Sequence, residues 1–458
     1  MIFNSLSFAI FFAVVCAVYY APLSWRLRKA FLTLASYAFY AGWYPHMIVL
    51  LWASTAFDWF VTRGMMRTQS VARRKLLLVG SVVLNIGFLG FFKYGAFLAR
   101  SANVLLGSTG LEIPVPDTIL PVGISFYTFM SLSYVIDTYR GVAKPAASFG
   151  DFALFLTFFP HLVAGPIVRS ADFLPQCTRE KQYSADRFAW GLVLIIVGLF
   201  EKTVIADALL APVADRVFAP GAHATTIEAW LGTLAFSGQI LCDFAGYSTC
   251  AVGAAACLGF RLPENFHAPY AARGFSDFWR RWHISLSSWL RDYLYISLGG
   301  NRRGTARTYV NLALTMLLGG LWHGASWTFV VWGGLHGLYL IIERSWRPAV
   351  QSSVVTFLLV TIAWVFFRAP DFSTAFGVLT TMSGVHHGGG IHLGLVDIAS
   401  VIAVLVAMLG LQRYFRERTL RDAFSDLRPG LVVVLLATML IACVVLSGDD
   451  RAFIYFQF

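Results

Sequence analysis

Long apolar runs, separated by short connections rich in Lys and Arg, fill most of the 458-residue chain. A helix needs about 20 apolar residues to cross the hydrocarbon core of a bilayer, so the chain has room for roughly ten to twelve spans. Residues 2–20 begin without a basic segment and end without a small-residue cleavage site, so we expect a retained first span. The pattern predicts an all-α polytopic protein with one integral membrane domain over residues 1–458.

Basic residues in the connections predict how the chain is oriented. Arg26, Arg28 and Lys29 follow the first apolar run, and a larger basic group lies at residues 63–75. Such groups favour the cytoplasmic side, which places the N-terminus outside the cytoplasm. The arginine-rich connection at residues 413–428 precedes another apolar run, so the C-terminus is expected outside as well.

The composition agrees with a membrane protein and argues against nucleic-acid binding. Hydrophobic residues make up 58% of the chain and charged residues 13%, against roughly 25% charged in a soluble domain. The formal net charge is +11, but the basic residues lie between apolar runs, where they act as topology signals. We therefore expect contacts with membrane lipids and no nucleic-acid partner.

Several apolar regions are interrupted in ways that simple spans do not explain. Three prolines precede residues 122–127, and Pro160 and Pro166 flank His161. Each proline removes a backbone donor, and broken backbone at membrane depth must be shielded by protein or line a water-filled cavity. Residues 275–297 mix aromatic residues with charged ones, which a lipid-facing helix would not carry cheaply. These features predict re-entrant or kinked elements around a central cavity.

His323 lies inside the apolar run at residues 311–340. An ionisable side chain is costly at this depth in a bilayer, so its presence indicates a specific role. Such groups at bilayer depth usually line a pathway or a reaction site, and histidine exchanges protons near neutral pH. A core histidine that bonds to a backbone carbonyl is the competing interpretation. We favour a membrane-embedded enzyme.

Other catalytic groups find little support in the sequence. The chain has no Gly-x-Ser-x-Gly elbow and no phosphate-binding loop. Its cysteines show no metal-type or paired spacing, and Cys250 and Cys257 are expected to be small residues on a close-packing helix face. His386, His387 and His392 could bind a metal in a loop, but carboxylates are scarce nearby, so we expect no metal site.

Several stretches, spread over nearly the whole chain, together resemble a known family. They are PVGISFYTFMSLSYVIDTYRG (121–141), FFPHLVAGPIVR (158–169), DFAGYST (243–249), LPENF (262–266), DFWRRWHISLSSWLRDYLYISLGGNRRG (277–304), GGLWHGASW (319–327) and FIYFQF (453–458). The chain resembles the membrane-bound O-acyltransferases (MBOAT), and in particular their bacterial branch for alginate O-acetylation. The resemblance implies a helical membrane scaffold around a central acyl-transfer tunnel.

The resemblance also implies roles for two histidines. His323, in Trp-His-Gly, matches the active-site histidine of the family, and His283, in Arg-Trp-His, matches its second functional histidine. His323 would act as a general base on an acceptor hydroxyl, a contribution of about 10² to 10⁴-fold, or as an acyl relay. His283 would orient the donor, support a proton relay or line the cytoplasmic mouth.

Arginines around His283 suggest a donor that carries phosphate, because guanidinium groups bind phosphate oxygens well. We expect acetyl-CoA as a substrate and no permanently bound cofactor; an acyl carrier's phosphopantetheine is the alternative. Ordinary topology bias and lipid-headgroup contact compete with this interpretation. The candidate donor-binding residues are Arg280, Arg281, Arg291, Arg302 and Arg303.

Four further polar residues lie in or beside apolar stretches: Asp137, Asp243, Asp292 and Asn311. Asp292 is expected to hold the neighbouring Arg291. Asn311 precedes His323 by twelve residues, about 18 Å along one helix, which is too far for contact. Asp243 either lines the cavity or makes a structural hydrogen bond, and the sequence leaves both open.

The expected function is transfer of acetyl from a cytoplasmic donor across the bacterial inner membrane, for O-acetylation of an exported or cell-surface polysaccharide such as alginate. The resemblance implies an extracytoplasmic SGNH-type transferase as partner, which would supply the serine nucleophile that this chain lacks. Transfer of D-alanyl or another acyl group to an envelope polymer is the main alternative. A transporter or flippase and a membrane-embedded glycosyltransferase are further ones.

Overall fold

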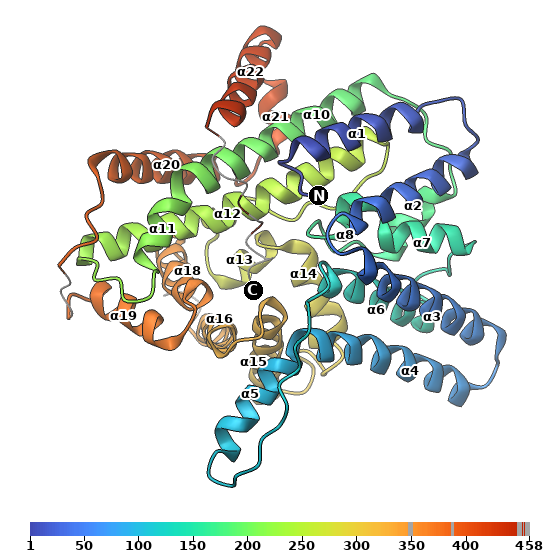
Figure 1. The fold of residues 1–458 in the computed structure, drawn as a ribbon, viewed down its shortest axis with the longest axis horizontal. Helices are drawn as coiled ribbons and strands as arrows, with labels where there is room; N and C mark the ends of the chain where they lie inside the picture. Colours follow the sequence, from blue (N-terminus) through green and yellow to red (C-terminus); the bar gives the residue numbers. More distant parts are fainter. Residues whose placement is uncertain (347–350, 386–388, 447–450, 452, 454–458) are drawn as a thin grey trace. The chain divides into compact units, whose positions relative to one another are not determined.

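The computed structural model describes residues 1–458 except 347–350, 386–388, 447–450, 452 and 454–458. All regular secondary structure in these described residues is helical (Figure 1), which confirms the all-α prediction. The chain divides into two compact units, one of residues 1–192 and 251–263 and one of residues 193–250 and 264–458. Two long helices, α10 (Ala185–Leu199) and α12 (Thr226–Cys257), contribute residues to both units.

The first unit contains the helices before α10. They are α1 (Leu6–Tyr19), α2 (Trp25–Ala41), η1 (Pro45–Met47), α3 (Ile48–Arg67), α4 (Val71–Leu89), η2 (Gly90–Tyr94), α5 (Gly95–Leu106), α6 (Ile124–Arg140), α7 (Phe149–Thr157), α8 (Phe159–Leu162) and α9 (Ser170–Cys177). A buried polar cluster joins three of them: Asn85 Nδ2 on α4 donates to Asp58 on α3 at 2.8 Å, and Ser131 on α6 donates to the same carboxylate. The cluster satisfies a carboxylate that would be costly to bury alone.

The second unit holds the two histidines that the sequence singled out. Its elements are η3 (Phe200–Leu210), α11 (Ala211–Val217), most of α12, η4 (Pro269–Ala271), α13 (Phe275–Arg281), α14 (Ile284–Trp289), η5 (Leu290–Tyr295), α15 (Thr305–His323), α16 (Trp327–Ser345), α18 (Ser353–Arg368), α19 (Phe372–Met382), α20 (Leu395–Tyr414), α21 (Leu420–Ser425) and α22 (Pro429–Val445).

Three helical stretches among the described residues are long and apolar enough to cross a bilayer: Val71–Leu106, Thr226–Cys257 and Leu395–Tyr414. The most apolar windows of the first and third are 17% buried, whereas that of the second is 78% buried. The first and third therefore present apolar surface that suits lipid, and the second forms core. Four shorter apolar helices add to them, and the number of true spans stays a prediction.

The interruptions predicted around prolines are present in the first unit. Residues 107–123 are not helical, and α6 begins after Gly123, whose φ of 74° suits glycine. The helix α8 that contains Pro160 is only four residues long. Its His161 is fully buried, and its Nε2 lies 2.8 Å from the carbonyl of Phe155, whereas its Nδ1 has no hydrogen-bond partner among the described residues.

The segment at residues 275–297 is also broken, as its mixture of charges and aromatic rings predicted. Helix α13 ends at Arg281, and α14 begins after His283, which has a left-handed φ of 42°. The segment then widens into the π-helical turn η5. Such turns and left-handed non-glycine residues are often found at functional sites.

The close packing predicted for Cys250 and Cys257 is confirmed. Cys257 lies in the first unit and Cys250 in the second. A Cβ on Gly191 would lie 2.5 Å from the sulfur of Cys257, and one on Gly198 would lie 2.8 Å from that of Cys250. The thiols lie 3.5 Å from carbonyls of the facing helix, those of Phe188 and Ile195. Both cysteines act as small packing residues beside glycines.

The hairpin of α15 and α16 depends on an equally close approach. A Cβ on Gly320 would lie 2.2 Å from the carbonyl oxygen of Phe329, and one on Gly333 would lie 2.3 Å from that of Met316. Neither contact tolerates a side chain without separating the helices. The paired glycines therefore fix α15 against α16, and with it the position of His323 at the end of α15.

We expect Gly320→Ala to lower the thermal unfolding midpoint of the purified protein, because overpacking of this kind costs about 1–3 kcal/mol. Gly410→Ala on α20 is the matched control, since a Cβ there has nothing within 4 Å. Its midpoint should equal or exceed that of the wild type, because alanine favours a helix over glycine. A Gly320→Ala midpoint equal to that of Gly410→Ala would show that the helix contact is not close.

Candidate active site

His323 is held at the turn between α15 and α16. It is the last residue of α15, and Gly324 follows with an extended backbone. A Cβ on Gly324 would lie 2.2 Å from the ring of Phe329, so the Trp-His-Gly motif needs glycine here for steric reasons. Ser326 then caps α16 by accepting from the N–H of Thr328 at 3.3 Å.

Aromatic rings surround the side chain of His323, which is 3% exposed. The ring centroids of Trp322, Trp332 and Phe367 lie 5.1, 5.0 and 5.4 Å from its own. These neighbours exclude water and lower the local dielectric, which strengthens electrostatic interactions with a reacting group. The position at a helix C-terminus also favours the positive charge that appears when the imidazole accepts a proton.

His283 lies beside His323, with their ring centroids 6.2 Å apart. It is fully buried and packs edge-on against Phe244 at 4.6 Å and against Trp322 at 5.7 Å. The structure thus brings together the two histidines that the family resemblance indicated, although they are forty residues apart in the sequence.

Asn265 orients His283 and was missed by the sequence reasoning about catalytic residues. Its Oδ1 accepts from the backbone N–H of Ser285 at 3.2 Å and from the Ser285 hydroxyl at 2.9 Å. The same oxygen lies 3.1 Å from His283 Nδ1, so Nδ1 must carry the proton that it donates. In the neutral ring, His283 Nε2 is then a hydrogen-bond acceptor. No described residue donates a hydrogen bond to this nitrogen.

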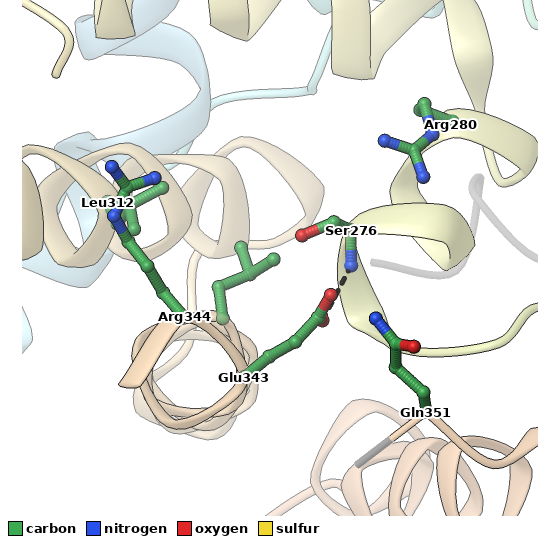
Figure 2. Close-up of a pocket in the computed structure, with 7 residues that line it drawn as sticks. Ser276, Arg280, Leu312, Glu343, Arg344 and Gln351 are labelled. Atoms are coloured by element: carbon green, nitrogen blue, oxygen red, sulfur yellow. Dashed lines mark hydrogen bonds between the residues drawn. The ribbon is translucent and has the colours of Figure 1, made fainter. Parts of the chain in front are cut away.

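A cavity of about 280 Å³ lies at the opposite end of the same hairpin (Figure 2). Its wall on α15 includes Leu312, eleven residues before His323, which corresponds to about 16 Å along the helix axis. Glu343 on α16 points to α13 and accepts from the N–H of Ser276 at 2.9 Å. The cavity is lined by Ser276, Arg280, Leu312, Leu340, Glu343, Arg344 and Gln351.

Arg280 is the candidate donor-binding arginine that lines this cavity, and its side chain is 71% exposed. Arg344 faces the same space from α16, and the sequence reasoning did not select it (Figure 2). It was missed because it lies 53 residues after Arg291, and nothing in the sequence indicates that α16 packs beside α13. The cavity thus combines two guanidinium groups with one carboxylate, two neutral polar side chains and two leucines.

Arg281 has a structural role in the connection between α13 and the segment after α20. Its Nε donates to Asp277 at 3.0 Å, and its terminal nitrogen donates to the carbonyl of Arg416 at 3.0 Å. Burial alone would raise the pKa of Asp277, but the N–H of Arg273 and the guanidinium groups of Arg281 and Arg416 hold it below its usual value. Asp277 is therefore an anion at neutral pH.

The other three candidate arginines do not line the cavity. Arg291 pairs with Asp292, Nε to Oδ1 at 2.7 Å, as the sequence predicted. Arg302 and Arg303 are exposed in the connection before α15. Their part in donor binding stays a prediction.

The remaining polar residues of the sequence analysis have structural partners. Asn311 Nδ2 donates to the carbonyl of Gly300 at 2.8 Å, which ties α15 to the preceding turn. Asp243 forms a buried ion pair with Lys202, whose Nζ also lies 2.9 Å from Asp207. These contacts support the structural alternative for Asp243.

Phe453 packs its buried ring 4.7 Å from that of Tyr247, so Phe453 contributes to the core of the second unit.

The loop histidines give no support to a metal site. His386 and His387 lie outside the described residues, and His392 has a left-handed backbone. Within the described part of the chain, no group of three His, Cys, Asp or Glu residues is arranged to hold a metal ion.

Comparison with known proteins agrees with this arrangement. The profile of MBOAT, the membrane-bound O-acyltransferase family, matches residues 83–385. A probable alginate O-acetylase AlgI of Azotobacter vinelandii is 42% identical over 91% of this chain and 86% of its own length. A peptidoglycan O-acetyltransferase of Helicobacter pylori is 38% identical over 80% of this chain and 75% of its own. A teichoic acid D-alanyltransferase of Bacillus subtilis is 26% identical over 72% and 85%.

The fold and the site therefore define a membrane-embedded acyltransferase. The chain belongs to the membrane-bound O-acyltransferase family. Within that family it is an O-acetyltransferase of the alginate O-acetylase branch.

We expect Asn265→Leu to reduce acetyl transfer by about 10- to 100-fold, because leaving the buried Nδ1–H of His283 without an acceptor costs about 1–3 kcal/mol. Leucine keeps the volume of the side chain but cannot accept the proton of His283 Nδ1. Asn265→Asp keeps an accepting oxygen and should retain more activity. Ser287→Ala is the control in α14, because the Ser287 hydroxyl bonds the carbonyl of Trp282 instead.

The measurement is the rate of labelled acetyl transfer by purified variants, with their thermal midpoints as a check of folding. A folded Asn265→Leu variant with the rate of Ser287→Ala would refute the orienting role.

Proposed function

We propose that the protein takes acetyl from acetyl-CoA on the cytoplasmic side of the bacterial inner membrane and passes it on for O-acetylation of an exported polysaccharide. The observation that carries this proposal is the pairing of His283 with His323 in a buried aromatic site, 6.2 Å apart. An arginine-lined cavity lies at the other end of the hairpin that holds His323.

The cavity supports a donor that carries phosphate at one end and a thioester at the other. Arg280 and Arg344 provide two guanidinium groups for phosphate oxygens. About 16 Å along α15 separate Leu312 at the cavity from His323, a span that a long linear pantetheine arm can bridge. The arginines around the cavity also favour a location on the cytoplasmic side of the membrane. Both chain termini are proposed to lie on the opposite, extracytoplasmic side.

In the proposed reaction, His323 takes the proton of an acceptor hydroxyl as its oxygen attacks the thioester carbonyl. The carbon–sulfur bond then breaks, and the leaving thiolate takes the proton from the imidazolium, which yields an acetyl ester and the thiol of CoA. His283 Nε2 offers a second hydrogen-bond acceptor, which can bind an N–H group of the donor or of the acceptor beside the reacting hydroxyl. The buried aromatic walls keep water from the thioester.

The relatives suggest the class of acceptor. Those named as alginate O-acetylases and as a peptidoglycan O-acetyltransferase are 38% identical or more, whereas the D-alanyltransferase of B. subtilis is 26% identical. We therefore favour acetyl over D-alanyl, and alginate as the acceptor polymer. An extracytoplasmic SGNH-type transferase is the proposed partner and provides the serine that receives acetyl before the polysaccharide.

We expect His323→Ala to abolish transfer of labelled acetyl from acetyl-CoA to the partner in proteoliposomes, with a loss of at least about 10²-fold, since a general base contributes that much. His46→Ala, which alters an exposed histidine of the first unit, should transfer at the wild-type rate. Thioester turnover that continues unchanged in His323→Ala would refute the proposed role.

We expect Arg280→Ala and Arg344→Ala each to raise KM for acetyl-CoA about 3- to 10-fold with little change in kcat, because their charges contact the donor's phosphates and not the thioester. The effect should shrink as salt is added, since these side chains are exposed and screened. Arg100→Ala, an exposed arginine on α5, is the control for loss of charge. Equal KM values in all three variants would place the donor elsewhere.

A further inference from the structure

His336 is a buried histidine that the proposed chemistry does not use. It lies on α16, is fully buried and has hydrogen-bond partners for neither ring nitrogen among the described residues. His161, in contrast, satisfies Nε2 with a backbone carbonyl. A buried polar group without a partner is costly, so such a group calls for an explanation.

The rings that pack against His336 carry further unsatisfied donors. Trp279 and Trp332 contact it at centroid distances of 5.1 and 4.8 Å, and the indole nitrogen of each is buried without a hydrogen-bond partner in the described residues. Elsewhere in the aromatic core, the buried indole nitrogen of Trp282 also has no hydrogen-bond partner in the described residues, whereas the indole of Trp364 donates to the hydroxyl of Tyr270 at 3.2 Å. One small region therefore gathers two N–H donors and an imidazole that can both donate and accept.

The location of His336 connects the two parts of the site. Trp332, four residues earlier on α16, contacts the ring of His323 at 5.0 Å. Leu340 and Glu343, four and seven residues later, line the arginine-rich cavity. Positions four apart lie on one face of a helix, about 6 Å along its axis. His336 thus lies midway between the cavity and His323, on the same face of α16.

We propose that His336, with the indole N–H groups of Trp279 and Trp332, binds the amides of the donor's pantetheine arm. Each amide offers a carbonyl that accepts from an indole and an N–H that donates to an imidazole nitrogen, which matches the unsatisfied groups. This inference rests on the proposed function, because it assumes a pantetheine thioester as donor. In this arrangement the donor's phosphates lie at Arg280 and Arg344, its amides at His336 and its thioester at His323.

The test measures binding, so it does not depend on turnover. Purified full-length protein is titrated with an acetyl-CoA analogue in which a methylene group replaces the sulfur, and with adenosine 3′,5′-bisphosphate as competitor of that analogue. We expect His336→Phe to weaken binding of the analogue about ten-fold, the effect of losing a buried hydrogen bond. Binding of the bisphosphate, which lacks the arm, should stay unchanged.

Tyr339→Phe is the matched control, because Tyr339 also packs against His336, at 5.8 Å, but its hydroxyl lies 3.3 Å from the carbonyl of Leu359. It should bind the analogue like the wild type. His336→Gln keeps a donor and an acceptor and should restore part of the affinity. If His336→Phe does not fold, Trp279→Phe replaces it, with the same expected selective loss.

Unchanged affinity for the analogue in the folded variants would refute the role of His336 and leave water as the partner of these groups. Equal weakening of analogue and bisphosphate would refute it too, since this indicates a general structural effect. Failure of the wild type to bind the analogue would instead refute the donor assigned under the proposed function.

Discussion

The close contact between α15 and α16 is the constraint on which the rest of the site depends. Gly320 and Gly333 bring the two backbones so near that a single Cβ at either position would meet a carbonyl oxygen at 2.2 or 2.3 Å. The contact ends in the tight turn at Gly324, which directs His323 into the aromatic core. The same hairpin carries the cavity at its other end. One packing interaction therefore sets both the position of His323 and its distance from the cavity.

The second constraint is the burial of polar rings among aromatic ones. His283 and His323 are 0% and 3% exposed, and a buried imidazole without a defined partner would be free to adopt either tautomer. Asn265 removes this freedom for His283 by accepting at Nδ1. The enclosure also excludes water and strengthens the electrostatic interactions of the few polar atoms that remain.

The sequence predicted the helical class, the broken segments and the two histidines, because these depend on local patterns. Prolines, charges inside apolar runs and the Trp-His-Gly motif can be recognised in the sequence itself. The residues that contact these groups in the folded protein could not be predicted from it. Asn265 precedes His283 by eighteen residues and Arg344 follows Arg280 by sixty-four, so their proximity depends on tertiary packing. Five arginines looked alike in the sequence. Arg280 and Arg281 both lie near Asp277, but the Arg280 side chain is 71% exposed and lines the cavity, whereas that of Arg281 is 13% exposed.

The central claim is that a pantetheine thioester extends along α16 from the arginine-lined cavity to His323. A cryo-electron microscopy structure of the full-length protein with the methylene analogue of acetyl-CoA tests it most directly. We expect the acetyl carbonyl within about 3–4 Å of the His323 ring, near-attack range, and the phosphates beside Arg280 and Arg344. An analogue bound with its carbonyl away from His323, or with its phosphates outside this cavity, would refute this arrangement of the donor.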